Sequence, residues 1–220
     1  MNTYSLIEDN IGALTTSDFA NRKERDRQIR KSDILKAAEH IFALKGYHQA
    51  TMQDIAKYAQ YATGTVYLYF KDKDELYFSL FEEKMKYLLF ALKEKTGHIE
   101  NARKKLDAFI QIQLGFFEKN QDFFRIFVSE RSTPHSVKNS RHSKSPVARE
   151  FREFLNQIIK VAQEQNVIRD DYQAKEIAEI FFTIFTSVIF GWLKEDPAKT
   201  KDLKKLSDFI LDMFLSGAGK

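Results

Sequence analysis

The sequence has no cysteine, and its 220 residues include only three prolines and eight glycines. The absence of cysteine excludes disulfides, cysteine-ligated zinc sites and thiol catalysis, and suits a reducing compartment. Because helix-breaking residues are few and Lys, Glu, Leu and Ile are abundant, the composition favours helices. We therefore predict an all-α protein of about nine helices in the cytoplasm.

Long apolar runs are also scarce. The longest covers residues 180–193, includes two threonines and a serine, and falls short of the roughly 18 residues that cross a bilayer. Residues 1–20 show no basic segment followed by an apolar one, so we predict no signal peptide. The apolar run is expected to form a buried core or interface helix, with no membrane partner.

Enzyme motifs are missing as well. We find no HExxH, no GxxxxGK[ST], no GxSxG and no dinucleotide-binding glycine pattern. His135 and His142 fall in a basic, Ser-rich segment at 132–145, where a solvated loop is favoured because metal and catalytic sites need a rigid frame. We predict no enzymatic activity, no cofactor and no metal site.

The net charge of +4 is modest, but basic residues gather at 22–31, where six of them stand against two acidic ones. Two interpretations stay open for this run. It can be a solvated helix start, as charge runs usually are, or an arm that lies along phosphates.

Apolar residues recur at helical spacing from Ile34 to Phe42, and Gly46 is expected to end that helix. Thr51, followed three residues later by Asp54, predicts the capped start of a second helix.

The next stretch, T-G-T-V-Y-L-Y-F at 63–70, prefers a strand by local propensity. A strand there would lack a partner for its backbone hydrogen bonds. We therefore predict a short third helix, held by packing of Val66 and Phe70 on its neighbours.

A fourth helix is predicted where Asp72 is followed three residues later by Glu75. The remaining periodic segments predict five more helices, separated at 132–145 by a mobile Ser-rich linker: 102–118, 121–131, one from Pro146, 173–194 and 201–216.

The segment from Thr51 to Leu76, T-M-Q-D-I-A-K-Y-A-Q-Y-A-T-G-T-V-Y-L-Y-F-K-D-K-D-E-L, resembles the DNA-binding core of TetR-family transcriptional regulators. With the preceding helix the resemblance covers about 45 residues, and it rests on the T-x-x-x-I-A run, the G-T-V-Y-x-Y-F block and K-x-K-D-E-L. It implies a helix-turn-helix domain at 22–71 and a ligand-binding and dimerisation domain at 72–220. Residues 1–21 are polar and weakly patterned, which predicts a flexible extension, either a disordered tail or a loosely docked segment.

The resemblance also implies which residues contact double-stranded DNA. Thr51 and Gln53 fall where the family places phosphate and base contacts, and Lys73, with Lys71 as a second candidate, would clamp the backbone. The expected major-groove set is Thr63, Gly64, Thr65, Tyr67, Leu68 and Tyr69.

The turn departs from the family pattern, which commonly has Gly and then Ser two residues later. Here these positions hold Gln60 and Ala62. A non-glycine residue at φ > 0 costs roughly 1 kcal/mol, and loss of a Ser cap costs about as much. Thr63 could serve as a substitute cap, so the first residue of the recognition helix is left open.

We expect the C-terminal half to hold two copies of the chain together as a homodimer. A single helix-turn-helix domain (head) makes few base contacts, whereas two heads can read a palindromic operator. The expected interface residues lie on the last two helices; a core role within one chain is the alternative for each. They are Phe182, Phe185, Ile189, Trp192, Phe209, Ile210, Met213 and Phe214.

By the family's mechanism, a ligand bound in the C-terminal domain changes the separation of the two heads. Abundant Phe and Ile predict a small apolar effector. The segments M-K-Y-L-L and T-G-T-V-Y-L-Y-F-K-D-K-D-E-L are similar to those of fatty-acid-responsive members. The expected lining is Phe109, Gln113, Phe117, Phe127, Phe154 and Phe181. The leading hypothesis is thus a ligand-released repressor; the alternative is a helical protein–protein adaptor with a vestigial helix-turn-helix.

Overall fold

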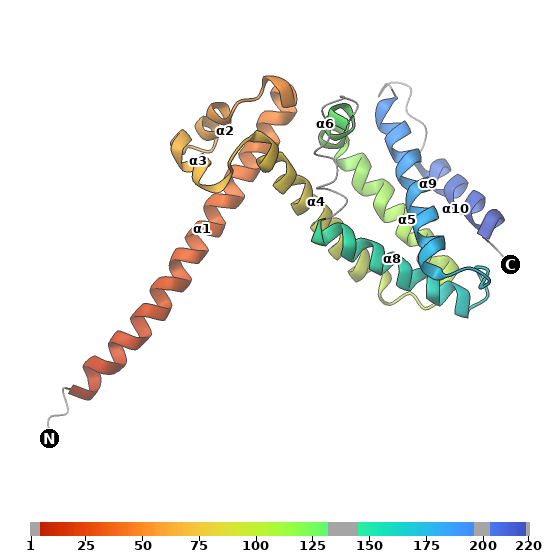
Figure 1. Cartoon of the computed structure of the whole chain (residues 1–220), viewed down its shortest axis with the longest axis horizontal. Coiled ribbons are helices and arrows are strands. Elements are labelled where there is room, and N and C mark those ends of the chain that lie inside the picture. Colours follow the sequence, from red (N-terminus) through yellow and green to blue (C-terminus); the bar gives the residue numbers. More distant parts are fainter. Residues whose placement is uncertain (1–4, 132–144, 196–202, 219–220) are drawn as a thin grey trace. The chain divides into compact units, whose positions relative to one another are not determined.

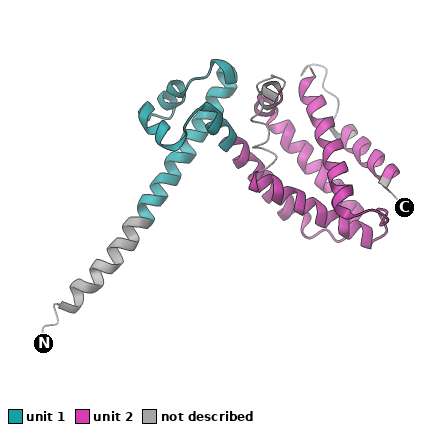
Figure 2. Ribbon diagram, viewed as in Figure 1, with its two compact units in different colours: residues 1–79 teal, residues 80–220 magenta. Residues whose placement is uncertain are grey.

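The computed structural model describes residues 5–131, 145–195 and 203–218. Within these ranges the chain forms nine α-helices and no β-strand, which confirms the all-α prediction. The chain divides into two compact units, residues 1–79 (unit 1) and 80–220 (unit 2), shown in Figure 2. The boundary expected from the sequence, after residue 71, falls slightly earlier.

Unit 1 comprises α1 (Ser5–Gln49), α2 (Met52–Tyr58), α3 (Thr63–Tyr69) and the first turns of α4 (Lys73–Thr96), labelled in Figure 1. Helix α1 begins within the segment expected to form a flexible extension; the flexibility itself stays a prediction. Near its end α1 is interrupted at Gly46, whose φ of 73° lies in the left-handed region. This confirms the expected helix break at Gly46. Glycine suits the position because residues with L side chains rarely adopt that conformation.

The core of unit 1 forms where α1, α2 and α3 meet. Ile34, Ala38, Ile55, Val66 and Phe70 are all buried there. In Figure 1 the two short helices lie beside the C-terminal part of α1, and α1 packs on α2 and α2 on α3. Helices of seven residues are marginal in isolation, so this packing supplies most of their stability.

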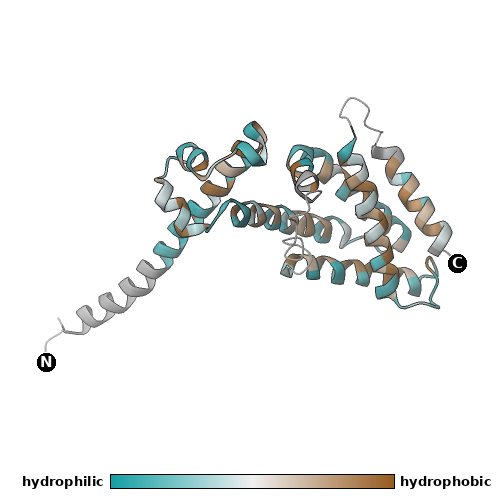
Figure 3. Ribbon diagram, turned by 45° about the horizontal axis from the view of Figure 1, so that its top comes forward, coloured by the Kyte–Doolittle hydropathy of each residue, from teal (hydrophilic) through white to brown (hydrophobic). Residues whose placement is uncertain are grey.

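Unit 2 contains the rest of α4, followed by α5 (Ala102–Lys119), α6 (Gln121–Arg131), α8 (Pro146–Glu164), α9 (Ala174–Lys194) and α10 (Leu203–Ala218). Helix α9 packs against α8, α6 and α10, while α5 packs against α8 and α10. Figure 3 shows apolar and polar stretches alternating along these helices, as expected of amphipathic helices around a shared core.

Helix starts in unit 2 follow the local sequence. The Asn101 side chain caps α5 by accepting a hydrogen bond from the Lys104 N–H at 2.9 Å. Ser145 caps α8. Pro146 occupies the first turn of α8, which confirms the helix start predicted there. The predicted mobile linker, with His135 and His142, lies outside the described residues apart from Ser145.

Helix α9 is long and apolar enough to cross a membrane by length and composition alone. The apolar run at 180–193 is shorter, but Ala174, Ile177 and Ala178 extend it upstream in the same helix. Eight residues of α9 are buried inside unit 2. One side of α9 is therefore buried in unit 2, while Ile180 and Ile184 on its other side are exposed.

Candidate nucleic-acid interface and ligand domain

Helix α2 begins with a complete capping box. The Thr51 hydroxyl accepts the Asp54 N–H at 3.1 Å, and the Asp54 carboxylate accepts the Thr51 N–H at 3.1 Å. Lys45 donates to the same carboxylate at 2.7 Å, and this bond, together with the Thr51 contacts, lowers the pKa of Asp54 to about 2. Thr51 is therefore engaged in the cap, whereas Gln53, on the exposed side of α2, is not.

The turn between α2 and α3 is held by a different set of contacts. Gln60 adopts φ 61°, the left-handed conformation that the family usually gives to glycine. The Tyr61 hydroxyl donates to the Asp33 carboxylate at 3.0 Å, and burial and then this bond raise the pKa of Tyr61. Tyr61 thus anchors the turn to α1 through its hydroxyl as well as its ring.

The first residue of α3 is Thr63, with Ala62 at the N-cap position and no side-chain cap. Thr63 therefore does not replace the missing Ser cap, and the question left open by the sequence is settled. A helix start without a side-chain cap leaves backbone N–H groups free to point outward.

Helix α3 has one inward and one outward side. Val66 is 0% exposed and Phe70 follows it into the core, as predicted. Leu68 is 81% and Tyr67 52% exposed, and Thr63, Thr65 and Tyr69 are half-buried. The structure thus brings the predicted major-groove set together on one short helix whose long side chains face solvent.

Gly64 lies on this outward side in the first turn of α3. A Cβ added at Gly64 would meet no atom within 4 Å, and its backbone is not left-handed. No contact within the described protein therefore requires glycine here, although glycine inside a helix costs roughly 0.5–1 kcal/mol relative to alanine. The open space is suited to close approach of an external partner.

The two predicted backbone clamps differ in the structure. The Lys73 ammonium donates to the carbonyls of Tyr47 at 2.6 Å and Ala50 at 2.9 Å, and lies 4.5 Å from the Tyr47 ring centroid. A third bond goes to the His48 carbonyl at 3.2 Å. All three N–H donors of Lys73 are used inside unit 1, and its expected phosphate contact stays a prediction; the Lys71 side chain is exposed.

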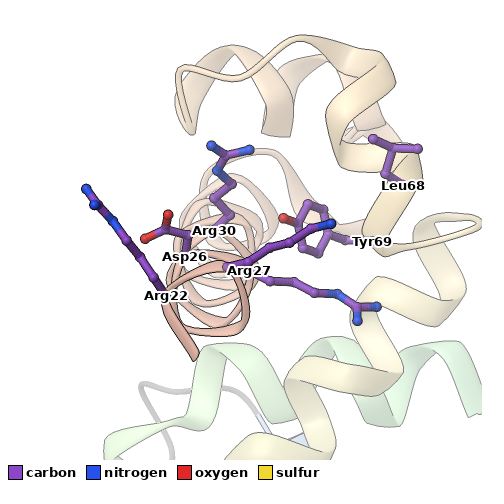
Figure 4. Close-up of a pocket in the computed structure, with 7 residues that line it drawn as sticks. Arg22, Asp26, Arg27, Arg30, Leu68 and Tyr69 are labelled. Atoms are coloured by element: carbon purple, nitrogen blue, oxygen red, sulfur yellow. The ribbon is translucent and has the colours of Figure 1, made fainter. Parts of the chain in front are cut away.

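Unit 1 also has a hollow that the residue-by-residue predictions did not include. It measures about 600 Å³ and is bounded by side chains of α1 and by Leu68 and Tyr69 of α3 (Figure 4). The α1 residues are Arg22, Lys23, Asp26, Arg27 and Arg30. The basic run at 22–31 was the sequence signal, but its position beside α3 required the fold.

In unit 2 three of the six expected ligand-lining residues, Phe109, Phe154 and Phe181, lie in one aromatic cluster. Phe109 is 5.8–6.3 Å, centroid to centroid, from three other phenylalanines, Phe151, Phe154 and Phe181. Phe117 and Gln113 are buried on the same helix, and Phe154 is half-buried. Phe127 belongs to α6, but its side chain lies outside the described residues.

The expected interface residues divide into buried, half-buried and exposed ones. Phe185, Ile189, Trp192, Ile210 and Phe214 are buried within unit 2, so the alternative of an intrachain core describes their placement. Phe182 is half-buried and lies 6.2 Å from Phe151. Phe209 and Met213 are exposed; sequence reasoning missed two further exposed apolar residues, Ile180 and Ile184.

In residues 5–131, 145–195 and 203–218 no group of three or more His, Asp or Glu side chains could hold a metal ion.

In unit 1 the helices α1, α2 and α3 present a short, uncapped helix to solvent, and the chain continues into the larger helical unit 2. This combination is that of a helix-turn-helix transcriptional regulator. Residues 34–80 match the model of bacterial regulatory proteins of the tetR family, and residues 81–217 match that of the YsiA-like protein C-terminal region. The chain belongs to the TetR family of DNA-binding transcriptional regulators.

Individual relatives have low sequence identity to this chain but match it over long stretches. The fatty acid metabolism regulator protein of Bacillus subtilis (strain 168) is 25% identical over 193 residues, covering 88% of this chain and 97% of that protein. The HTH-type transcriptional activator FasR of Mycolicibacterium smegmatis is 28% identical over 123 residues, 54% of this chain and 55% of that protein. These relatives are regulators rather than enzymes.

Solved structures show the same fold. The transcriptional regulator FadR from Bacillus subtilis, in complex with stearoyl-CoA, superposes with a TM-score of 0.72 and 24% identity, over 84% of this chain and 98% of that one. The fatty acid degradation regulator FadR from Bacillus halodurans gives a TM-score of 0.71 at 24% identity, with the same coverage.

Proposed function

We propose that this chain is a cytoplasmic, homodimeric repressor that binds a palindromic operator through α3 and leaves it when unit 2 takes up a long-chain acyl-CoA. The observation that carries DNA reading is the outward side of α3. A leucine that is 81% exposed, beside exposed Tyr67 and the open Gly64, stabilises nothing inside the protein. Such residues suit contact with base edges and thymine methyl groups in a major groove.

A homodimer is supported by the exposed side of α9 and α10. The exposed positions of α9 between Ile180 and Gly191 carry no charge; they are Ile180, Thr183, Ile184, Ser187 and Gly191. On α10, Phe209 and Met213 are exposed one turn apart. Small and apolar residues without charges are typical of the centre of a helix–helix interface.

An acyl ligand is supported by the interior of unit 2. The cluster around Phe109 and Phe181 offers a large, adaptable apolar environment of the kind that long hydrocarbon chains need. One solved structure of the same fold, that of FadR from Bacillus subtilis, is a complex with stearoyl-CoA. A ligand changes DNA binding only if its affinities for the DNA-bound and the DNA-free protein differ. The hydrocarbon chain of the ligand must therefore enter a space that these helices can rearrange.

Two buried donors support a polar end on that ligand. Arg125 donates through one terminal nitrogen to the Glu195 carbonyl at 2.7 Å, while its other terminal nitrogen and Nε are buried without an acceptor. The indole N–H of Trp192, one turn before Glu195, is buried without an acceptor as well. Each such group costs about 1–3 kcal/mol, which a thioester, carboxylate or phosphate oxygen would offset.

The test is a fluorescence-anisotropy titration of the dimer on the DNA upstream of its own gene, with random duplex as competitor. We expect preference for the upstream DNA, and release by stearoyl-CoA but not by coenzyme A alone. Stearate, which lacks the large head, separates recognition of the chain from recognition of the head. Arg125→Gln should weaken the response to stearoyl-CoA while leaving DNA affinity unchanged.

Failures at different steps have different meanings. A dimer with no preference over random duplex contradicts the regulator proposal and returns the protein to the adaptor alternative. Specific binding that no acyl compound alters contradicts only the ligand. Tighter binding on addition of stearoyl-CoA would make the protein an acyl-CoA-dependent binder instead of a released repressor.

A further inference from the structure

The excess positive charge of the chain is concentrated in one helix segment. The run 22–31 has six basic and two acidic residues, a net charge of +4 that equals that of the whole chain. The remainder of the sequence is therefore balanced. A balanced protein with one strongly basic segment directs its long-range attraction for anions to that segment.

The fold places this charge beside the DNA-reading helix. Lys23, Arg27 and Arg30 follow one another at four- and three-residue spacing along α1, and Arg22 directly precedes Lys23. These four residues, here called the basic stripe, line the hollow that also holds Leu68 and Tyr69. Figure 4 shows the labelled arginines extending from α1, with Leu68 and Tyr69 on α3. Side chains three and four residues apart share a helix face, so the stripe and the exposed end of α3 border one concave surface.

The stripe is not neutralised within unit 1. Its one ion pair joins Arg27 to Glu24 at 4.0 Å, and both partners are largely exposed. In the described part of the chain no ion pair involves Arg22, Lys23 or Arg30, even though Asp26 lies one helical turn from Arg22 and from Arg30. Like charges one turn apart destabilise a helix by a few tenths of a kcal/mol, and Glu24 and Asp26 offset only part of the positive charge of this segment.

We propose that the basic stripe binds the phosphate backbone of the duplex that flanks the half-site read by α3. This rests on the proposed function as a DNA-binding regulator and extends the DNA contact from α3 to α1. Three arginines and a lysine around one hollow match successive phosphates in charge and in hydrogen-bond donors. Contact with phosphates positions the head on DNA without reading sequence.

A membrane surface is a poorer occupant of the same stripe. A helix that lies on a bilayer needs a broad apolar side next to its basic side. Between residues 21 and 31 the only large apolar residue is Ile29. The continuity with Tyr69 and Leu68, both members of the predicted major-groove set, favours a duplex.

Salt dependence gives a quantitative test. Each phosphate contact contributes about 0.9 to the slope of log K against log salt concentration. Replacing all four stripe residues by Gln should therefore lower that slope by about 3–4 for each bound protomer, and weaken binding to operator and random duplex alike. The slope is measured by anisotropy titrations of the full-length dimer over a series of KCl concentrations.

The matched control removes the same charge from exposed positions of unit 2: Arg103, Lys104, Arg149 and Lys160, each changed to Gln. The control should keep most of the wild-type slope, since its charges lie on helices α5 and α8. Circular dichroism and a thermal melt check that both variants are folded. Equal slopes for the stripe and control variants would overturn the proposal.

Flank length and Asp26 provide two independent checks. Shortening the duplex outside the half-sites should weaken the wild type and leave the stripe variant unaffected, because the variant has no contact there to lose. Asp26→Asn removes the negative charge within the stripe and should strengthen binding and steepen the slope. A stripe variant that loses preference among flanking sequences, with an unchanged slope, would indicate base reading and overturn the phosphate assignment.

These results separate the two proposals. A wild type without operator preference contradicts the regulator function, before any variant is compared. Operator preference that survives in the stripe variant at an unchanged slope contradicts only the role of α1.

Discussion

Helices α3 and α9 are built from similar residues, yet they place them in opposite environments. Residues that prefer strands over helices are common in both: Thr, Val and Tyr in α3, and Ile, Phe, Thr and Val in α9. In α9 eight residues are buried among α6, α8 and α10. In α3 only Val66 is buried, and the large side chains at 67 and 68 face solvent.

The difference shows where each helix obtains its stability. Helix α9 is a structural element, since its bulky side chains remove apolar surface from water inside the protein. Helix α3 has seven residues, too few for stability on its own, and depends on Val66 and the following Phe70. The other side chains of α3 are not needed for its folding and can contact a partner. Substitutions of buried residues in α9 should therefore affect folding, whereas substitutions of exposed residues in α3 should affect DNA binding.

The largest expected effect is at the centre of α9. Phe181 is 1% exposed and its ring lies 4.8 Å from that of Phe214 and 6.0 Å from that of Phe109. Phe181→Ala should lower the free energy of unfolding by about 3–5 kcal/mol, because a large buried ring leaves a cavity. Urea denaturation followed by circular dichroism measures the loss; a change below about 1 kcal/mol would contradict the core assignment.

The second effect concerns assembly and leaves folding intact. Met213 is 59% exposed on α10, in the proposed dimer interface. Met213→Glu should shift the dimer to monomer, since an unpaired charge in an apolar interface is strongly unfavourable. Sedimentation velocity measures the shift, with Lys175→Glu, at an exposed position near the start of α9, as control. A variant that stays dimeric would remove this face of α10 from the interface.

The fold could be read from the sequence because local signals agreed with each other. Gly46 ended a helix, Asp54 completed a cap with Thr51, and Pro146 opened α8, each through chemistry confined to a few neighbouring residues. The helical state of 63–70 required one further argument, that a lone strand has no hydrogen-bond partner. The predicted outward set on α3 followed from the resemblance and from the inward positions of Val66 and Phe70.

Features that depend on tertiary neighbours could not be read in this way. Helical spacing identifies an apolar face, but α9 is apolar on most sides, so it could not separate Phe185 in the core from Ile184 at the surface. Lys73 resembles a phosphate clamp in sequence, whereas its carbonyl partners belong to residues more than twenty positions earlier. The neighbourhood of the basic run and α3 likewise appears only once α1 and α3 are packed in unit 1.

On α3 an exposed and a buried side chain lie two residues apart, at Leu68 and Val66, and can be compared directly. Leu68→Ala should leave the unfolding free energy within about 0.5 kcal/mol of the wild type, because the side chain is 81% exposed. It should weaken operator binding by about tenfold or more, the size of one lost base contact. Val66→Ala should show the reverse order, with a clear loss of stability that precedes any loss of binding. Equal effects of both changes on stability would contradict the two-sided description of α3.

The smallest expected effect on stability is also the most selective for function. Gly64→Ala should raise the unfolding free energy by about 0.5–1 kcal/mol, because alanine is the better helix former and its Cβ meets no atom within 4 Å. The same methyl group should weaken operator binding, since it fills the space into which the DNA backbone or a base edge would come. Gly115 of α5 is the matched control: its added Cβ also meets nothing within 4 Å, so Gly115→Ala should stabilise the protein without changing DNA affinity. If Gly64→Ala proved more stable and bound operator as tightly as the wild type, the first turn of α3 would not approach DNA closely.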